Sequence, residues 1–242
     1  MRKCIVVAVG FLMSLSACKT PQTNSNTQQL PPTPALTMAD VLPVTQPTTP
    51  EAKAAQEAFI QEHVDRFKSR ALASAYYVLQ GQRTFKEEKT DSATYFFSRA
   101  YLMDSTNNDV YWGYGLLYGQ QQEYDKALFA LYHALKSDPG NPRLLNDVAT
   151  SHLSRFYVNS NPEDLLQSKK LLEQAVQQSP EEADLYYKLA ISSYYLREYE
   201  SAWGYLHKSQ TYDASVGDEA FISALLEKHP DPAGKYPTPP AP

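Results

Sequence analysis

Cys18 is the residue whose surroundings point most clearly to a chemistry, because its thiol is a nucleophile and it follows the small residues Ser16 and Ala17. The chain begins with the basic pair Arg2-Lys3 and continues into an apolar run, 4–15. That run is shorter than the roughly 20 residues that a membrane-spanning helix needs. A charged start, an apolar middle and small residues before a cut are typical of a cleaved secretory signal.

The stretch Leu15-Ser16-Ala17-Cys18 also resembles the lipobox of bacterial lipoproteins. The resemblance implies that residues 1–17 are removed and that the thiol of Cys18 is acylated, for example with palmitate, which holds the chain at a membrane. Because Lys19 rather than Asp follows the cysteine, it also implies the outer membrane, facing the periplasm. Two alternatives remain: a plain signal peptide with an incidental cysteine, and an uncleaved anchor helix, which the short apolar run disfavours.

Other reactive side chains are scattered along the chain. The five histidines are His63, His133, His152, His207 and His229. None of them has the spacing of a metal site, and no phosphate loop or nucleophile elbow occurs. With a net charge of −5 and no basic stripe, the sequence gives no sign of nucleic-acid binding. We therefore expect neither an enzyme nor a metal or other cofactor.

Two segments rich in proline flank the middle of the chain. Residues 18–50 combine the lipidated cysteine with a Pro/Thr-rich stretch that we expect to be a disordered tether. The apolar island 35–44 within it either docks on the folded part or is simply a less polar linker. Residues 230–242 are expected to form a disordered, solvated Pro-rich tail, with a ligand for an aromatic groove as the alternative.

Between these segments the sequence repeats itself. Gly115, Ala127, Leu131 and Ala134 have counterparts 34 residues earlier at Gly81, Ala93, Phe97 and Ala100. Related spacings recur downstream, from Leu145 to Pro180 and from Tyr186 to Ser209, although the connection in the third copy is longer, mostly through 156–161. A repeat of this length predicts a stack of similar units.

The copies resemble tetratricopeptide repeats (TPRs), whose unit is a helix, a turn and a second helix. The matching residues of the second copy are Tyr111, Tyr114, Gly115, Tyr118, Ala127, Leu131, Ala134 and Pro139. The resemblance implies an all-α, right-handed α-solenoid of about four repeats within 72–229. Residues 51–71 would form an N-terminal capping helix, and 217–229 a C-terminal one, because the open ends of a solenoid are apolar.

The residue types agree with this arrangement. Two antiparallel helices approach closely only where side chains are small, so Gly115 should face Ala127. Most aromatic residues should fill the remaining core, namely Tyr77, Phe97, Tyr111, Tyr114, Tyr118, Tyr124, Tyr186 and Tyr199. The pairs Asn141-Pro142, Asn161-Pro162 and Ser179-Pro180 each predict a helix start, with an N-cap followed by proline.

The resemblance further implies that the first helices line a concave groove that takes partner peptides or proteins. The positions that carry over are Val78, Gln82, Trp112, Leu116, Asn146, Thr150, Tyr187, Ile191, Tyr194 and Tyr195. Some TPR proteins grip a C-terminal carboxylate with Lys and Asn at such positions. The first of them hold Val78, Trp112, Asn146 and Tyr187 here, so the sequence does not support that clamp. Trp112 and Tyr187 are the expected anchors, unless they pack on a cap or on the tether.

These observations predict a membrane-anchored TPR scaffold that binds partner proteins in the periplasm, for assembly of envelope complexes or recruitment of cell-wall enzymes. One alternative is a surface lipoprotein that binds glycan or peptidoglycan on the aromatic groove. A second is a self-associating structural component, in which a homodimer fills the groove.

Overall fold

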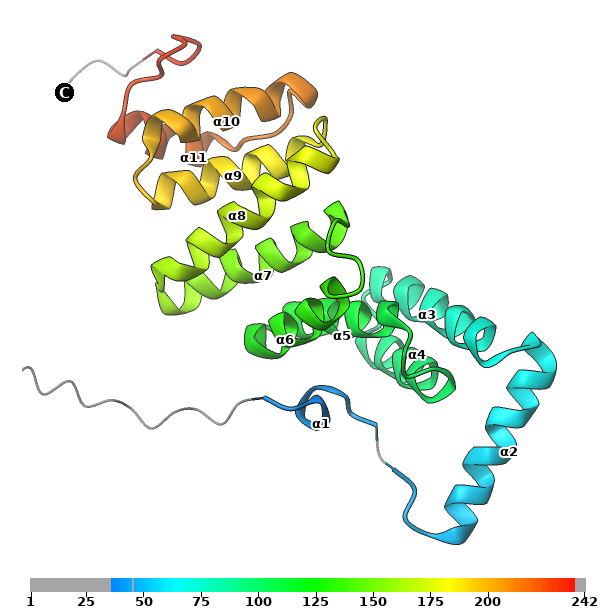
Figure 1. Ribbon diagram of the computed structural model, residues 1–242. Helices are drawn as coiled ribbons and strands as arrows, with labels where there is room; N and C mark the ends of the chain where they lie inside the picture. Colours follow the sequence, from blue (N-terminus) through cyan, green and yellow to red (C-terminus); the bar gives the residue numbers. More distant parts are fainter. Residues whose placement is uncertain (1–35, 45, 238–242) are drawn as a thin grey trace, which may run out of the picture. The chain divides into compact units, whose positions relative to one another are not determined.

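The computed structural model describes residues 36–44 and 46–237; the predicted signal peptide and Cys18 lie outside them. Helices α3 to α10 pair into four hairpins, and each hairpin packs on the next (Figure 1). The described residues contain no strand, so the all-α solenoid is confirmed. The helices are α1 (Met38–Val41), α2 (Pro50–Phe67), α3 (Arg70–Lys86), α4 (Thr90–Met103), α5 (Asn108–Gln120), α6 (Tyr124–Leu135), α7 (Pro142–Asn159), α8 (Pro162–Gln178), α9 (Ala183–Tyr195), α10 (Tyr199–Tyr212) and α11 (Glu219–Lys228).

Glycines set the close approach of the helices within the first two hairpins. A Cβ atom on Gly81 would lie 2.7 Å from the Phe97 ring, and one on Gly115 would lie 2.4 Å from Leu131 Cγ. The expected neighbour Ala127 contributes its backbone oxygen, 3.4 Å from the same point. The space above each glycine is therefore filled mainly by the large residue of the second helix, which is why small and large residues alternate in the repeat.

The turn inside the hairpin is the same in three repeats. Glu88, Gln122 and Arg197 occupy equivalent places and have φ values of 58°, 63° and 64°. The left-handed conformation reverses the chain between the two helices, although it is unfavourable for residues with a Cβ.

The third hairpin departs from this pattern. Helix α7 continues to Asn159 and ends at Ser160, which has a φ of 56°. Asn141 and Asn161 cap α7 and α8 as expected, each followed by proline. The third predicted start is wrong: Ser179 ends α8, and α9 begins only at Ala183. The carbonyl of Pro180 instead accepts a hydrogen bond from Tyr186 (3.0 Å), which holds this short turn outside the helix.

A buried polar network fastens the longer hairpin. His152 Nδ1 and Asp164 Oδ1 lie 2.7 Å apart, and both side chains are buried. Arg155 donates two further hydrogen bonds to Asp164 Oδ1 and one to Oδ2, and Tyr132 contacts the other ring nitrogen of His152 at 2.7 Å. Burial opposes ionisation of Asp164, but the hydrogen bonds from Arg155 and His152 hold its pKa below the usual value. The network therefore has a structural role, joining α6, α7 and α8.

Additional segments cover both ends of the repeats. Helix α2 lies against α3 through its half-buried Phe59, Ile60 and Phe67. At the other end, Leu225 of α11 is buried in the last cluster, together with Trp203 of α10. The tail was expected to be solvated from Pro230, yet Tyr236 stacks on Trp203 with ring centroids 5.8 Å apart. Burial of these two rings explains why the chain continues to pack after α11.

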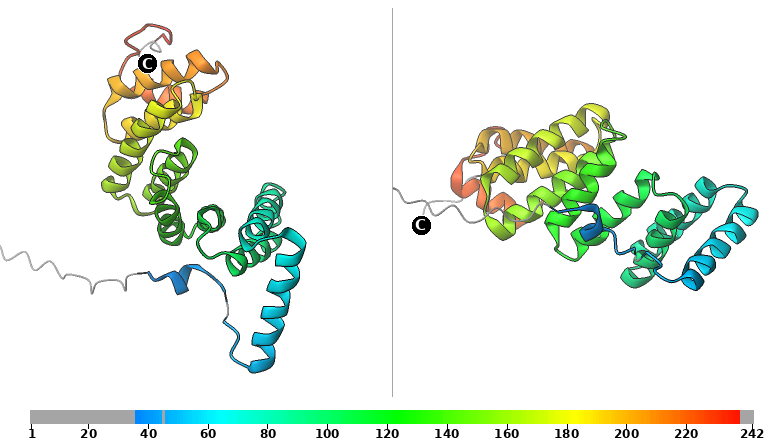
Figure 2. Two further views of the ribbon diagram at one scale, coloured as in Figure 1. Left: turned by 45° about the vertical axis from the view of Figure 1, so that its right-hand side comes forward. Right: turned by 60° about the horizontal axis from the view of Figure 1, so that its bottom comes forward.

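Residues 36–44, here called the N-terminal clip, dock on the second hairpin. Val41 and Leu42 are buried, and Tyr118 donates a hydrogen bond to the carbonyl of Val41 (2.6 Å). Figure 2 shows α1, in blue, beside the green α5–α6 hairpin. The described part of the apolar island therefore docks on the folded repeats and is not a free linker. Among the described helices, none combines the length and the apolar character needed to cross a bilayer.

Candidate functional site

Polar contacts link the first helices of successive repeats on one face, here called the first-helix face. Trp112 Nε1 of α5 donates to Asp147 Oδ2 of α7 at 2.7 Å. Asn146 of α7 donates to Asp184 of α9 at 3.0 Å. Tyr187 of α9 donates to Asp218, just before α11, at 2.9 Å. From the second repeat onward, each repeat is therefore held to the next repeat or to the C-terminal cap by a hydrogen bond to a carboxylate.

These carboxylates differ in their electrostatic surroundings. Lys188 donates to Asp184 at 2.5 Å, which balances that charge on the face. Burial raises the pKa of Asp147, although the Trp112 hydrogen bond and the positive charge of Lys188 act in the opposite direction. Asp147 therefore presents a charge that the fold only partly compensates.

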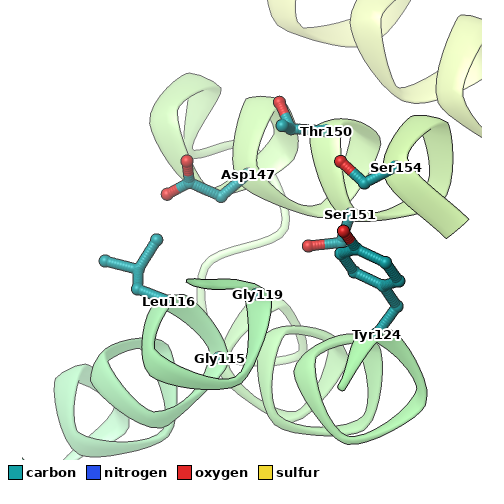
Figure 3. A pocket seen from close by; sticks show the side chains of 8 residues that line it. All are labelled: Gly115, Leu116, Gly119, Tyr124, Asp147, Thr150, Ser151 and Ser154. Carbon is teal, nitrogen blue, oxygen red and sulfur yellow. The ribbon is translucent and has the colours of Figure 1, made fainter. Parts of the chain in front are cut away.

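A small hollow lies between α5 and α7 beside Asp147, with a volume of about 160 Å³ (Figure 3). In the figure, Asp147 and Leu116 stand at one end, and Tyr124 and Ser151 stand at the other. The lining residues are Gly115, Leu116, Gly119, Tyr124, Asp147, Thr150, Ser151 and Ser154. Two predicted groove residues, Leu116 and Thr150, thus share a concave site with a carboxylate and several hydroxyl groups.

A chain of aromatic rings runs from the end of α7 across α9 to α11. This aromatic strip consists of Phe156, Tyr157, Tyr187, Tyr194, Tyr195 and Phe221, and neighbouring rings have centroid distances between 5.2 and 5.9 Å. Tyr157 and Tyr195 are 54% and 43% exposed. Burial among the neighbouring rings raises the pKa of Tyr157, so its hydroxyl stays neutral at physiological pH. The strip offers a neutral surface that is apolar over the rings and polar at the hydroxyls.

The predicted groove residues fall into distinct surroundings. Val78 is buried in the core, and Gln82 is half-buried on α3. Trp112, Asn146 and Tyr187 make the polar links between repeats, so the two expected anchors already have partners within the chain. Tyr194 and Tyr195 belong to the aromatic strip, and Ile191 is half-buried next to them on α9.

Several residues of this site were missed by sequence reasoning. Asp147 and Ser151 read as ordinary polar positions of a helix, and Tyr124 was assigned to the core, although it lines the hollow. Phe156 and Tyr157 lie in the insertion of the third repeat, outside the repeat pattern. The unusual run of apolar residues in that insertion was the available signal.

The chemistry that this arrangement supports is recognition. Aromatic rings, hydroxyl groups and a carboxylate can hold a ligand through packing and hydrogen bonds. Within the described residues, no three His, Cys, Asp or Glu side chains are grouped so that they could hold a metal ion. The Tyr132–His152–Asp164 contacts resemble a proton relay, but Arg155 occupies the same carboxylate and the pair is buried.

Comparisons with known proteins agree on the fold. No protein-family model matches the sequence, and no curated protein matches it. Among solved structures, PilF of Pseudomonas aeruginosa is 20% identical with a TM-score of 0.55, and the match covers 66% of this chain and 68% of that one. TTC0263, described as a thermophilic TPR protein of Thermus thermophilus, is 15% identical with a TM-score of 0.52 over 64% of this chain and 80% of that one.

A double mutant of MamA from RS-1 also matches, with 15% identity and a TM-score of 0.54, over 64% of this chain and 82% of that one. At such identities these likenesses show the fold alone. The described residues therefore form a TPR-type α-solenoid, as the repeat spacing predicts.

Proposed function

We propose that this protein is a non-enzymatic scaffold that binds partner proteins through its first-helix face. The observation that carries the proposal is the exposure of the aromatic strip. Tyrosine is enriched where proteins bind one another, because its ring buries a large area and its hydroxyl still forms a hydrogen bond. In the described part of the chain, no segment covers Tyr157 or Tyr195, which are the most exposed members of the strip.

The way in which the strip is built supports the same use. The extra length of α7 carries Phe156 and Tyr157 beyond the end of the regular repeat, where Tyr195 of α9 meets both rings. Because these rings are exposed, their apolar surface stays in contact with water. Burial in the core would have removed this unfavourable contact. A partner that covers the strip recovers this apolar surface.

The place of action that we propose rests on the sequence. Acylation of Cys18 would hold the chain at the envelope, at the outer membrane on the periplasmic side, and the Pro/Thr-rich stretch would give it reach. Anchoring raises the effective concentration of a bound partner at the membrane, which suits assembly of envelope complexes or recruitment of cell-wall enzymes. Replacing Cys18 by serine should move the protein from the membrane fraction to the soluble fraction. Retention of Cys18→Ser in membranes would contradict the anchor.

The test of partner binding compares three forms of the full-length protein as bait, with bound proteins identified after mild crosslinking in the native host. The double variant Tyr157→Ser plus Tyr195→Ser should capture at least tenfold less of a specific partner protein than the wild type does. The matched control is Tyr95→Ser, because Tyr95 is 49% exposed on α4, outside the strip. Equal capture by all three forms would contradict the proposal.

The same set of variants separates the alternatives. Strip-dependent retention of cell-wall fragments in place of proteins would establish the glycan-binding alternative. A dimer in sedimentation that the double variant abolishes would establish self-association.

A further inference from the structure

The hollow between α5 and α7 exists because side chains are small on both of its walls. Gly115 and Gly119 belong to α5, and Ser151 and Ser154 belong to α7. The two glycines differ in what surrounds them. Leu131 occupies the space above Gly115, whereas a Cβ atom on Gly119 would meet nothing within 4 Å. The open space is therefore on the Gly119 side, between the two repeats.

Polar groups in this hollow have acceptor and donor capacity that the chain does not use. Ser151 is only 7% exposed, and within the described residues its hydroxyl forms no hydrogen bond, nor do those of Ser154 and Tyr124. Asp147 accepts from Trp112 at Oδ2, which leaves Oδ1 without a donor in the same part of the structure. Ser151 is buried, whereas Asp147, Ser154 and Tyr124 are half-buried, so water can reach their polar atoms and a ligand that enters the hollow can displace that water.

The charge of the hollow selects the sign of the ligand. Asp147 is the only carboxylic acid among the lining residues, and no Lys, Arg or His side chain lines the hollow with it. The nearby Lys188 is engaged by Asp184 and by Asn146 Oδ1 (3.0 Å), so it is not free to pair with Asp147. A carboxylate ligand would be repelled here, and a cation would be attracted.

The volume of the hollow limits the size of the ligand. A cavity of about 150 Å³ holds a benzene ring, which has six heavy atoms. The butylammonium part of a lysine side chain has five, whereas the side chain of arginine is longer and ends in a wide planar group. Leu116 and the Tyr124 ring provide apolar surface for an aliphatic stem, and an ammonium group donates to the carboxylate of Asp147.

We propose that the hollow binds a primary ammonium group on an aliphatic stem, which in a partner protein is the side chain of lysine. The proposal rests on the proposed function and deepens it, since it names the residue that a partner inserts beside the aromatic strip. Asp147 Oδ1 pairs with the ammonium group at its end of the hollow, and the aliphatic stem lies along α7 towards the end that Ser151 and Tyr124 line.

The experiment is an NMR titration of the full-length protein with N-acetyl-lysine methylamide, and in parallel with the norleucine analogue, which lacks the ammonium group. We expect the lysine probe to shift the amide signals of Gly115, Gly119 and Ser151, with at least tenfold tighter binding than norleucine. Asp147→Asn should weaken lysine binding at least tenfold.

Filling the hollow is the second arm. Gly119→Leu should abolish the shifts, and it should fold, because the added Cβ meets open space in a helix that favours leucine over glycine. Gly204→Leu is the matched control, since its Cβ also meets nothing within 4 Å and it lies on α10, away from the hollow. Equal binding of both probes, absence of localised shifts, or undiminished binding by Gly119→Leu would each overturn the proposal.

This outcome is separable from that of the proposed function. The double variant Tyr157→Ser plus Tyr195→Ser should keep the lysine site intact while losing the partner. If partner capture depends on the strip but the lysine probe does not bind, only the present inference fails. If the lysine probe binds but the strip variant captures as much partner as the wild type, the proposed function fails and the lysine site stands.

Discussion

At the scale of single residues, the fold depends on which positions lack a side chain. Gly81 and Gly113 both face the ring of Phe97, where added Cβ atoms would come within 2.7 and 2.3 Å. One large ring thus packs against two helices, α3 and α5, that belong to different repeats. The sequence predicts Gly81, because size alternation at a fixed spacing is a local property that the repeat preserves. It does not predict Gly113, since Leu79 stands 34 residues earlier.

Replacing Ala127 by arginine tests this packing. Ala127 is fully buried, so the substitution overpacks the α5–α6 contact and buries an unpaired charge. We expect a loss of about 3–5 kcal/mol in the free energy of unfolding, measured by chemical denaturation. Gln174→Arg, at an exposed position of α8, is the control and should change little. A denaturation midpoint unchanged by Ala127→Arg would contradict the packing.

Asp147 carries an energetic cost in the fold, which the proposed lysine site would explain. Because burial raises its pKa in the folded state, the ionised carboxylate is less favourable in the fold than in the unfolded chain. This penalty is present at neutral pH and disappears as the pH falls below the ordinary value of the carboxyl group. Asp147→Asn should therefore raise the melting temperature at pH 7 and have less effect at pH 3.5. If Asp147→Asn raised the melting temperature more at pH 3.5 than at pH 7, the carboxylate would instead stabilise the fold.

At the scale of elements, the turns between the helices store strain. Gln122 has a φ of 63° and is exposed, so its side chain gains little in return for a conformation that suits glycine. Gln122→Gly should stabilise the protein by about 0.5–1 kcal/mol in thermal unfolding. The neighbouring Gln121 is also exposed but has a φ of −79°, so Gln121→Gly should destabilise. If both variants were destabilised equally, the turn would carry no such strain.

Helix boundaries divide into those that the sequence determines and those that tertiary contacts determine. Asn141 and Asn161 cap helices as predicted, because the capping group and the proline act within a few residues. Ser179-Pro180 carries the same local signal, yet it lies between helices, because the Tyr186 hydroxyl holds the carbonyl of Pro180. The extension of α7 was not predictable either, since the network of His152, Arg155 and Asp164 that fastens it joins separate elements.

At the scale of the whole described chain, segments that read as linker are part of the fold. The N-terminal clip and the tail around Tyr236 pack on surfaces that lie far away in the sequence. The apolar island 35–44 made docking of the clip one of two possibilities, whereas the proline-rich composition of the tail gives no local sign of packing. The hollow could not be predicted for a related reason, because it arises from glycines on one repeat that face serines on the next.

The clip should detach without unfolding the repeats. Val41 is fully buried, so Val41→Asp should release residues 36–44 and expose them to limited proteolysis at least tenfold faster. The melting temperature of the repeats should change little, because the four hairpins pack on one another without the clip. Ala39→Asp, at an exposed position of the same segment, is the control. Equal proteolysis of both variants and the wild type would mean that the clip is not held by Val41.

The distribution of the two tryptophans has a practical consequence. Trp203 is buried in the last cluster, whereas Trp112 is half-buried and its indole nitrogen donates to Asp147, which lines the hollow. The fluorescence emission of Trp203 should be blue-shifted and constant. The emission of Trp112 should respond to a ligand that displaces water around the Asp147 carboxylate. In a Trp203→Phe background, the protein therefore becomes its own fluorescent sensor, and occupancy can be followed before any ligand is labelled.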